Sequence, residues 1–271
     1  MSITMRTNIA SATAYNNVAR AGRGLTDTFS RVSSGLRISK AADDAAGLAV
    51  AESLDAEARS ARQAMRNTND GISAVQIAEG ATAEVGDLLK RMRELAVQSS
   101  SETLSNTERG YIDGEFDELN SEITRIANNT EFNGVSLTNG SSATLQIQVG
   151  TGGTANDRVT VNFGNLTSLG LGSAGLDTAA NARTAIGTID TAIGTVNSFR
   201  SDYGAGQNRL DTSLRAMENY SLNVTAAESR IRDADMAFET AEMTKYQVMQ
   251  QAGIAALAQA NSAQQSYLQL I

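Results

Sequence analysis

The chain has 271 residues, a formal net charge of −8 at pH 7, and no Cys, His or Pro. The absence of Cys and His excludes a disulfide framework, the usual zinc and transition-metal sites, and Ser–His or Cys–His catalytic pairs, while carboxylate-only catalysis and calcium binding stay open. The acidic charge argues against a nucleic-acid binder, and no run of 18 apolar residues is present to cross a membrane.

The first 42 residues carry six Lys or Arg and a single acidic residue, Asp27. A basic amphipathic start can indicate a membrane surface, but this one has few large apolar residues, so we expect no membrane partner. It also lacks the apolar stretch of a cleavable signal peptide, and export would need another route. Apolar residues here recur at alternating steps of three and four, which predicts a helix ending near 33–35. This line of positions, which we call a seam, comprises Tyr15, Val18, Gly22, Leu25, Phe29, Val32 and Leu36.

Two further helices are predicted after this break. Ser39 is a candidate cap for the first of them, whose seam covers residues 54–96. Ser105 and Glu108 have the spacing of a capping box and mark the start of the second, over about 112–126.

The chain then changes from helical to strand-like spacing. Asn133-Gly134 is a turn signal, and apolar residues alternate with polar ones over 145–149 and 159–163. These segments predict a β-hairpin. Residues 164–182 are rich in Gly, Ser, Thr and Asn, and we expect an exposed tip or linker there.

A long seam returns from Ala185 to Ala255, with 21 positions in one register of which only Gly206, Ser213 and Lys245 are not apolar. It predicts one coiled-coil-like helix or two helices stacked end to end, roughly 105 Å in length at 1.5 Å per residue. The predicted fold is mainly α: an elongated antiparallel coiled-coil or helical-bundle rod with a small β-hairpin, its N- and C-termini paired at one end.

We predict two domains. Residues 1–42 with 229–271 form a terminal helical domain, and 43–228 form a helical rod with the hairpin and a short variable tip at about 138–182. The terminal seams are rich in Ala and bury little apolar area, whereas ordering costs on the order of 1–2 kcal/mol per residue. We therefore expect the ends to gain order from neighbouring copies, which makes them an assembly device.

Four stretches resemble bacterial flagellin signatures, in the order that the family has them. They are RVSSGLRISKAADDAAGLAVAESL (31–54), NTNDGISAVQIAEGATAEVGDLLKRMRELAVQSS (67–100), TEFNGVSL (130–137) and SRIRDADMAFETAEMTKYQVMQQAGIAALAQANSAQQSYLQL (229–270). The resemblance implies a small flagellin without large outer domains, a non-enzymatic subunit that polymerises into the flagellar filament for motility. Its termini would line the filament core.

The resemblance also implies partners and a place of action. The chain would be secreted through the flagellar type III export apparatus with an export chaperone, and it would act in the extracellular filament. It would assemble with itself as a helical homopolymer and meet the filament cap and hook-junction proteins. By the same resemblance, Arg91, Leu95 and Glu115 are expected to contact a neighbouring protofilament and an animal Toll-like receptor. The expected polymerisation seam comprises Val18, Leu25, Phe29, Val32, Leu36, Ile231, Phe238, Val248, Leu268 and Leu270.

Several alternatives are weighed beside this interpretation. A hook–filament junction protein of the same superfamily shares the terminal architecture, and an adhesin or immune-modulating protein is a further option. Asp43-Asp44 could be a catalytic carboxylate pair, but acidic residues also favour a helix N-terminus. Ser and Thr within 136–184 could carry O-glycans or form an unmodified polar surface. We expect no catalytic residue, no metal and no cofactor.

Overall fold

The computed structural model describes residues 7–268. Its five α-helices are α1 (Ile9–Ser34), α2 (Ala45–Ser99), α3 (Asn106–Asn129), α4 (Ala179–Arg232) and α5 (Met236–Leu268). Its strands are β1 (Glu131–Phe132), β2 (Val135–Ser136), β3 (Thr144–Gln148) and β4 (Arg158–Asn162), with short 3-10 turns at Ala155–Asp157, Leu166–Ser168 and Leu171–Ser173. The predicted mainly helical fold with one small β-hairpin element is confirmed.

The chain divides into two compact units, with boundaries inside α2 and α4. The terminal unit comprises Met1–Ala56 and Asn223–Ile271, and the central unit comprises Glu57–Leu222.

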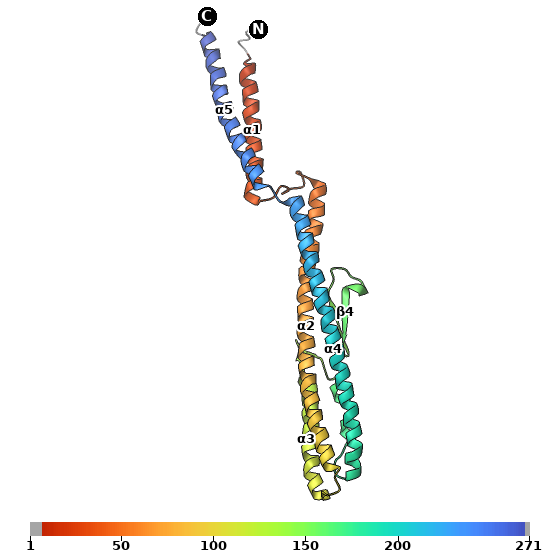
Figure 1. Ribbon diagram of the computed structural model, residues 1–271. Helices are drawn as coiled ribbons and strands as arrows, with labels where there is room; N and C mark the ends of the chain where they lie inside the picture. Colours follow the sequence, from red (N-terminus) through yellow and green to blue (C-terminus); the bar gives the residue numbers. More distant parts are fainter. Residues whose placement is uncertain (1–6, 269–271) are drawn as a thin grey trace. The chain divides into compact units, whose positions relative to one another are not determined.

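In the terminal unit, α1 and α5 form an antiparallel pair (Figure 1). Near the start of α1, the side-chain amide of Asn8 donates to the carbonyl of Ala260 at 3.1 Å. At the other end of the pair, the guanidinium of Arg31 contacts the carboxylate of Glu239 at 3.4 Å. The start of α1 therefore lies beside the end of α5, as the sequence predicted.

Two short connectors of the terminal unit are joined by backbone hydrogen bonds. The amide of Arg37 donates to the carbonyl of Arg232 at 2.7 Å, and the amide of Ala234 donates to the carbonyl of Gly35 at 2.9 Å. Gly35 ends α1 in the left-handed region with φ 72°, which glycine adopts without steric cost.

The long C-terminal seam is carried by two helices rather than one. Asp235 caps α5, because its side chain accepts from the amides of Ala237 and Phe238 at 2.9 and 3.2 Å. The predicted cap at Ser39 is wrong. Helix α2 begins at Ala45, and it is Asp44 whose carboxylate accepts from the amide of Gly47 at 2.9 Å.

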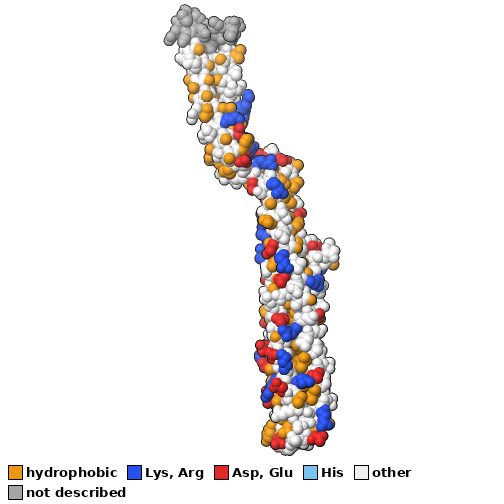
Figure 2. All heavy atoms as spheres, viewed as in Figure 1, with side chains coloured by type: hydrophobic (Ala, Val, Ile, Leu, Met, Phe, Trp, Pro, Cys, Tyr) orange, Lys and Arg blue, Asp and Glu red, His pale blue; other side chains and the backbone are white. Residues whose placement is uncertain are grey.

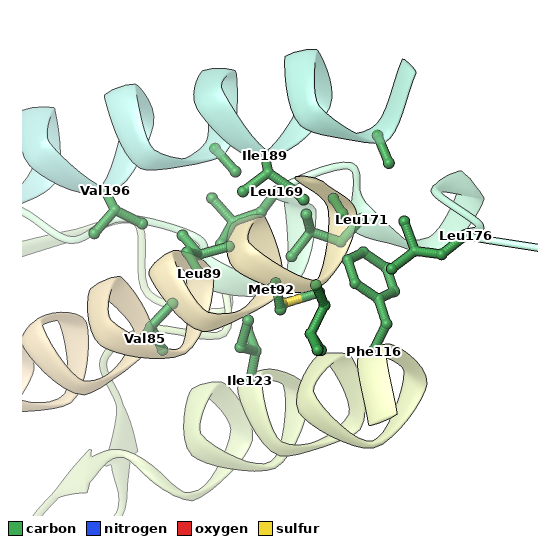
Figure 3. Close-up of a cluster of buried hydrophobic side chains, with 14 of the residues drawn as sticks. Val85, Leu89, Met92, Phe116, Ile123, Leu169, Leu171, Leu176, Ile189 and Val196 are labelled. Carbon is green, nitrogen blue, oxygen red and sulfur yellow. The ribbon is translucent and has the colours of Figure 1, made fainter. Parts of the chain in front are cut away.

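The central unit packs α2, α3 and α4 around one hydrophobic cluster (Figure 3). The predicted seam of α2 faces this interior, with Val85, Leu89 and Met92 fully buried. At the start of α3, the predicted capping box between Ser105 and Glu108 is present. Its two halves are a hydrogen bond from the Ser105 amide to the Glu108 carboxylate at 2.7 Å and one from the Glu108 amide to the Ser105 hydroxyl at 3.3 Å.

The expectation of an exposed tip at 164–182 is wrong. Leu166, Leu169, Leu171 and Leu176 from this segment are buried among the side chains of α2, α3 and α4 (Figure 3). The glycines between them let the chain turn tightly, so the leucines close the core while polar neighbours face outward.

The predicted hairpin is formed by β3 and β4, which pair antiparallel with Ile147 opposite Val159. It packs on the long helices through two glycines. Ile147 lies where a Cβ on Gly71 of α2 would stand, and Val161 lies against Gly206 of α4. The buried ring of Tyr203 from α4 completes this second cluster. Asn133-Gly134 forms the tight turn between β1 and β2, with φ 51° and 76°.

Candidate functional site

The contact between α1 and α5 buries little apolar surface. The Tyr246 ring covers Gly24, and Val18 covers Gly253, so the two helices approach closely where side chains are smallest. Polar residues fill much of the remaining contact, since Thr28 and Glu239 are only 4% and 5% exposed. Little apolar surface is therefore removed from water between these helices.

Along α4, the positions of the predicted C-terminal seam face the interior of the protein, but on α5 they face water. No seam position from Ala185 to Ala234 is exposed. On α5, by contrast, the same register falls entirely on exposed positions, which are Phe238, Ala241, Lys245, Val248, Ala252 and Ala255. The break at residues 233–235 changes the direction in which the later seam positions point, because each residue turns an α-helix by about 100°.

Helix α5 consequently has two apolar faces. One face, which includes Met243, Tyr246 and Leu257, is half-buried in the terminal unit. The other, which we call the outer face of α5, consists of the exposed seam positions Phe238, Ala241, Val248 and Ala255, while Lys245 and Ala252 line a groove between α1 and α5. Phe238 on this face is 62% exposed and Val248 is 58% exposed.

Exposed apolar side chains also occur elsewhere on the pair, and Figure 2 shows apolar groups on the visible side of this part of the chain. On α1, Tyr15 and Phe29 are 66% and 63% exposed. Such surfaces on a water-facing protein usually mark an interaction site.

The other residues of the predicted polymerisation seam are distributed differently. Val18, Leu25, Val32, Leu36 and Ile231 are half-buried within the terminal unit. The side chain of Leu268 and all of Leu270 lie outside the described residues.

A groove of about 840 Å³ runs between α1 and α5. It is lined by cationic and small apolar residues, without a carboxylate: Asn17, Arg20, Ala21, Arg23, Gly24, Lys245, Tyr246, Met249, Ala252, Gly253 and Ala256. Lys245 is paired with Glu242 on its own helix at 2.8 Å. Within residues 7–268, Arg20 and Arg23 form no salt bridge.

The structure brings Arg91 and Glu115 together on the central unit. The guanidinium of Arg91 donates to the Glu115 carboxylate at 2.8 and 3.1 Å and to Glu94 at 3.2 Å. These hydrogen bonds raise the pKa of Arg91, the bond to Glu115 most. Leu95 is only 2% exposed and belongs to the hydrophobic cluster beneath, so it does not share their surface.

The described residues contain no group of three or more His, Cys, Asp or Glu placed to hold a metal ion. Asp43 and Asp44 instead accept hydrogen bonds from nearby backbone amides, those of Ser39 and Lys40 for Asp43 and that of Gly47 for Asp44. Over the described part of the chain, none of the helices is both long and apolar enough for a membrane span.

Comparison with known proteins places both ends of the chain in one family. The model for the bacterial flagellin N-terminal helical region matches residues 5–143, and that for the C-terminal helical region matches residues 186–271. A flagellin of Halalkalibacterium halodurans is 45% identical over 248 residues, covering 89% of each chain. A flagellar filament 33 kDa core protein of Treponema phagedenis is 38% identical, covering 97% of this chain and 98% of its own.

A solved structure is similar as well. The crystal structure of Bacillus cereus flagellin aligns with a TM-score of 0.51 at 33% identity, covering 56% of this chain and 88% of that one. This flagellin thus matches part of the chain in both sequence and fold.

Proposed function

The chain belongs to the bacterial flagellin family and is a structural subunit of the flagellar filament, and from this premise we propose that its copies associate through the α1–α5 pair. The observation that carries this proposal is the outer face of α5. A seam that packs inside the protein along α4 continues in the same register onto α5, where it is exposed.

Physical chemistry favours association of this surface. Covering a Phe or Val side chain contributes about 1.5–3 kcal/mol relative to leaving it in water. Phe238 and Val248 are more than half exposed, and the contact of α5 with α1 is thin and partly polar. Contact with another copy therefore stabilises helices that one copy alone covers poorly, as in folding coupled to binding.

The roles of the two parts of the chain follow from this proposal. Residues 1–42 and 229–271 form the inner part of the filament, with Leu268 and Leu270 contributing to its apolar contacts. Residues 43–228 surround it.

Further partners are proposed from family membership. The chain is exported through the flagellar export apparatus with a chaperone, acts outside the cell, and meets the cap and hook-junction proteins. It contains no Pro or Cys, which suits a chain that must pass unfolded and then form helices quickly. We assign it no catalytic activity.

Arg91 and Glu115 are proposed as a contact to a neighbouring protofilament and to an animal Toll-like receptor. Their salt bridge is about half exposed, so both charges are accessible. Leu95 supports this surface from below, because its burial positions the turn of α2 that carries Arg91.

The assembly proposal is tested by Phe238→Gln combined with Val248→Gln. Gln keeps good helix propensity while removing apolar surface. We expect an unchanged monomer by circular dichroism and at least about tenfold less sedimentable filament, since the loss of two apolar contacts is worth more than 1.4 kcal/mol.

The matched control is Leu222→Gln, which removes a 70% exposed apolar side chain from α4 of the central unit. We expect this variant to polymerise. Normal filaments from the double variant, or equal loss in both proteins, would contradict the assignment to α5.

A further inference from the structure

The dipeptide Asn-Gly occurs twice in one stretch of the chain, at Asn133-Gly134 and Asn139-Gly140. In such a pair, the glycine nitrogen can attack the amide carbon of the Asn side chain, because glycine has no Cβ to block the approach. The two sites differ in conformation, and that difference predicts different reactivity.

At Asn139, the side chain is folded back over its own backbone. The amide of Ser141 donates to Oδ1 of Asn139 at 2.9 Å, which is the hydrogen bond of an Asx-turn. The ring closed by this hydrogen bond contains both the nitrogen of Gly140 and the side-chain amide carbon of Asn139, so it limits how far the two can separate. Within the described residues, the Gly140 amide donates to no other group.

The same hydrogen bond polarises the reacting carbonyl. Oδ1 gains negative charge as the nitrogen adds to the carbon, and a donor already in place stabilises that charge. Gly140 and Ser141 are exposed, so water reaches the site for the second step.

The ends of this loop are held by the fold. The amide of Leu166 donates to the carbonyl of Thr138 at 2.8 Å, and the amide of Phe163 donates to the carbonyl of Ala143 at 2.9 Å. The two residues that flank 139–142 are therefore held in the folded protein, and a changed linkage within the loop leaves them in place.

Asn133 provides an internal comparison. It occupies the first central position of a two-residue hairpin turn, with φ 51°, and the flanking residues Phe132 and Val135 are paired as strands. In the described residues, the side chain of Asn133 accepts no hydrogen bond, whereas that of Asn139 accepts one from the Ser141 amide.

We propose that Asn139 is a site of self-catalysed deamidation in the folded protein, and that Asn133 is protected. The nitrogen of Gly140 forms a bond to Cγ of Asn139 and loses its proton, while the Cγ–Nδ2 bond breaks and ammonia leaves. Water then opens the resulting succinimide at either of its C–N bonds, giving aspartate or isoaspartate. The net reaction consumes one water and releases one ammonia, and it changes the formal net charge from −8 to −9.

The test is to age the purified full-length protein at neutral pH and follow both sites by mass spectrometry. Trypsin releases residues 126–158 as one peptide, because no Lys or Arg lies between Arg125 and Arg158. Fragment ions separate the two sites, and digestion in heavy-oxygen water marks any change that occurs during digestion.

We expect Asn139 to react at least about fivefold faster than Asn133 in the folded chain, since orientation of reacting groups accelerates intramolecular attack. In concentrated urea, we expect the two rates to agree within about twofold, because both sites are then the same flexible dipeptide. Asn139→Gln should remove most of the native conversion, and Asn133→Gln should leave it nearly unchanged.

Equal rates in the folded chain would overturn the proposal, and so would a ratio that unfolding does not alter. Conversion that persists in the Asn139→Gln variant would do the same.

Discussion

The ring of Tyr246 occupies the space in which a Cβ on Gly24 would stand: a Cβ built there lies 2.6 Å from two ring carbons. This contact joins α5 to α1 at a point where α1 has no side chain. The aromatic ring fits there because Gly24 has no side chain.

Gly24→Ala should therefore destabilise the α1–α5 pair by about 1–3 kcal/mol, because the ring must move to admit a methyl group. Amide hydrogen exchange in α1 measures the effect. The control is Gly22→Ala, two residues away, where a Cβ meets nothing within 4 Å. This change should stabilise the helix by roughly 0.5–1 kcal/mol. Equal exchange in the two variants would show that the Tyr246 contact is not tight.

Tyr203→Phe should cost the central unit about 1–3 kcal/mol, although it removes a single oxygen. The amide of Gly164 donates to the Tyr203 hydroxyl at 3.0 Å, and both residues are buried, so the variant leaves an unpaired N–H. The urea midpoint of helix loss measures the change. Tyr111→Phe, at a position 78% exposed, should leave the midpoint unchanged. Equal midpoints for the two variants would mean that the hydroxyl contributes nothing.

Leu176→Ala should lower the free energy of unfolding by about 2–5 kcal/mol, because it leaves a cavity where a fully buried side chain was packed. Leu222→Ala, at a position 70% exposed, is the control and should change thermal stability by less than about 0.5 kcal/mol. A Leu176 variant as stable as the control would show that the 164–182 segment does not close the core.

The pair of Arg93 and Asp190, with 2.6 Å between Nε and Oδ1, should make stability depend on pH. The hydrogen bond from Arg93 lowers the pKa of Asp190 below its ordinary 3.8. A carboxylate with a lowered folded pKa stabilises the fold above its unfolded pKa, and the contribution is lost as pH falls through the folded value.

Asp190→Asn should accordingly lower the urea midpoint at pH 7, and the difference from the parent protein should vanish well below pH 3.8. Asp117→Asn is the control, because Asp117 is exposed and has no salt bridge in the described residues. A difference that persists in acid would assign the effect to packing instead.

Most of the fold could be predicted from spacing. The seams of α2 and α4, the capping box at Ser105 and the β3–β4 hairpin each depend on a local periodic pattern or a paired signal. The leucines at 166, 169, 171 and 176 follow neither period, so their burial could not be recognised in a Gly-rich segment. Their function depends on distant helices that only the folded chain brings together.

The orientation of α5 was also beyond the sequence pattern. Its apolar residues continue the register of α4, but the Asp235 cap starts a new helix with a different phase. On α5, the seam positions are thus exposed, and Phe238 and Val248 are each more than half exposed. The close approach at Gly24 and the buried Glu239 had no signal either, because each depends on which face of α1 is opposite.

The number of residues in the connector at 233–235 determines which face of α5 contacts α1. Deleting one residue there would swing every later side chain by about 100° around the helix axis. The side chains that now contact α1, such as that of Tyr246, would turn away from it. The number of residues in this connector is therefore constrained together with the Asp235 side chain that caps α5.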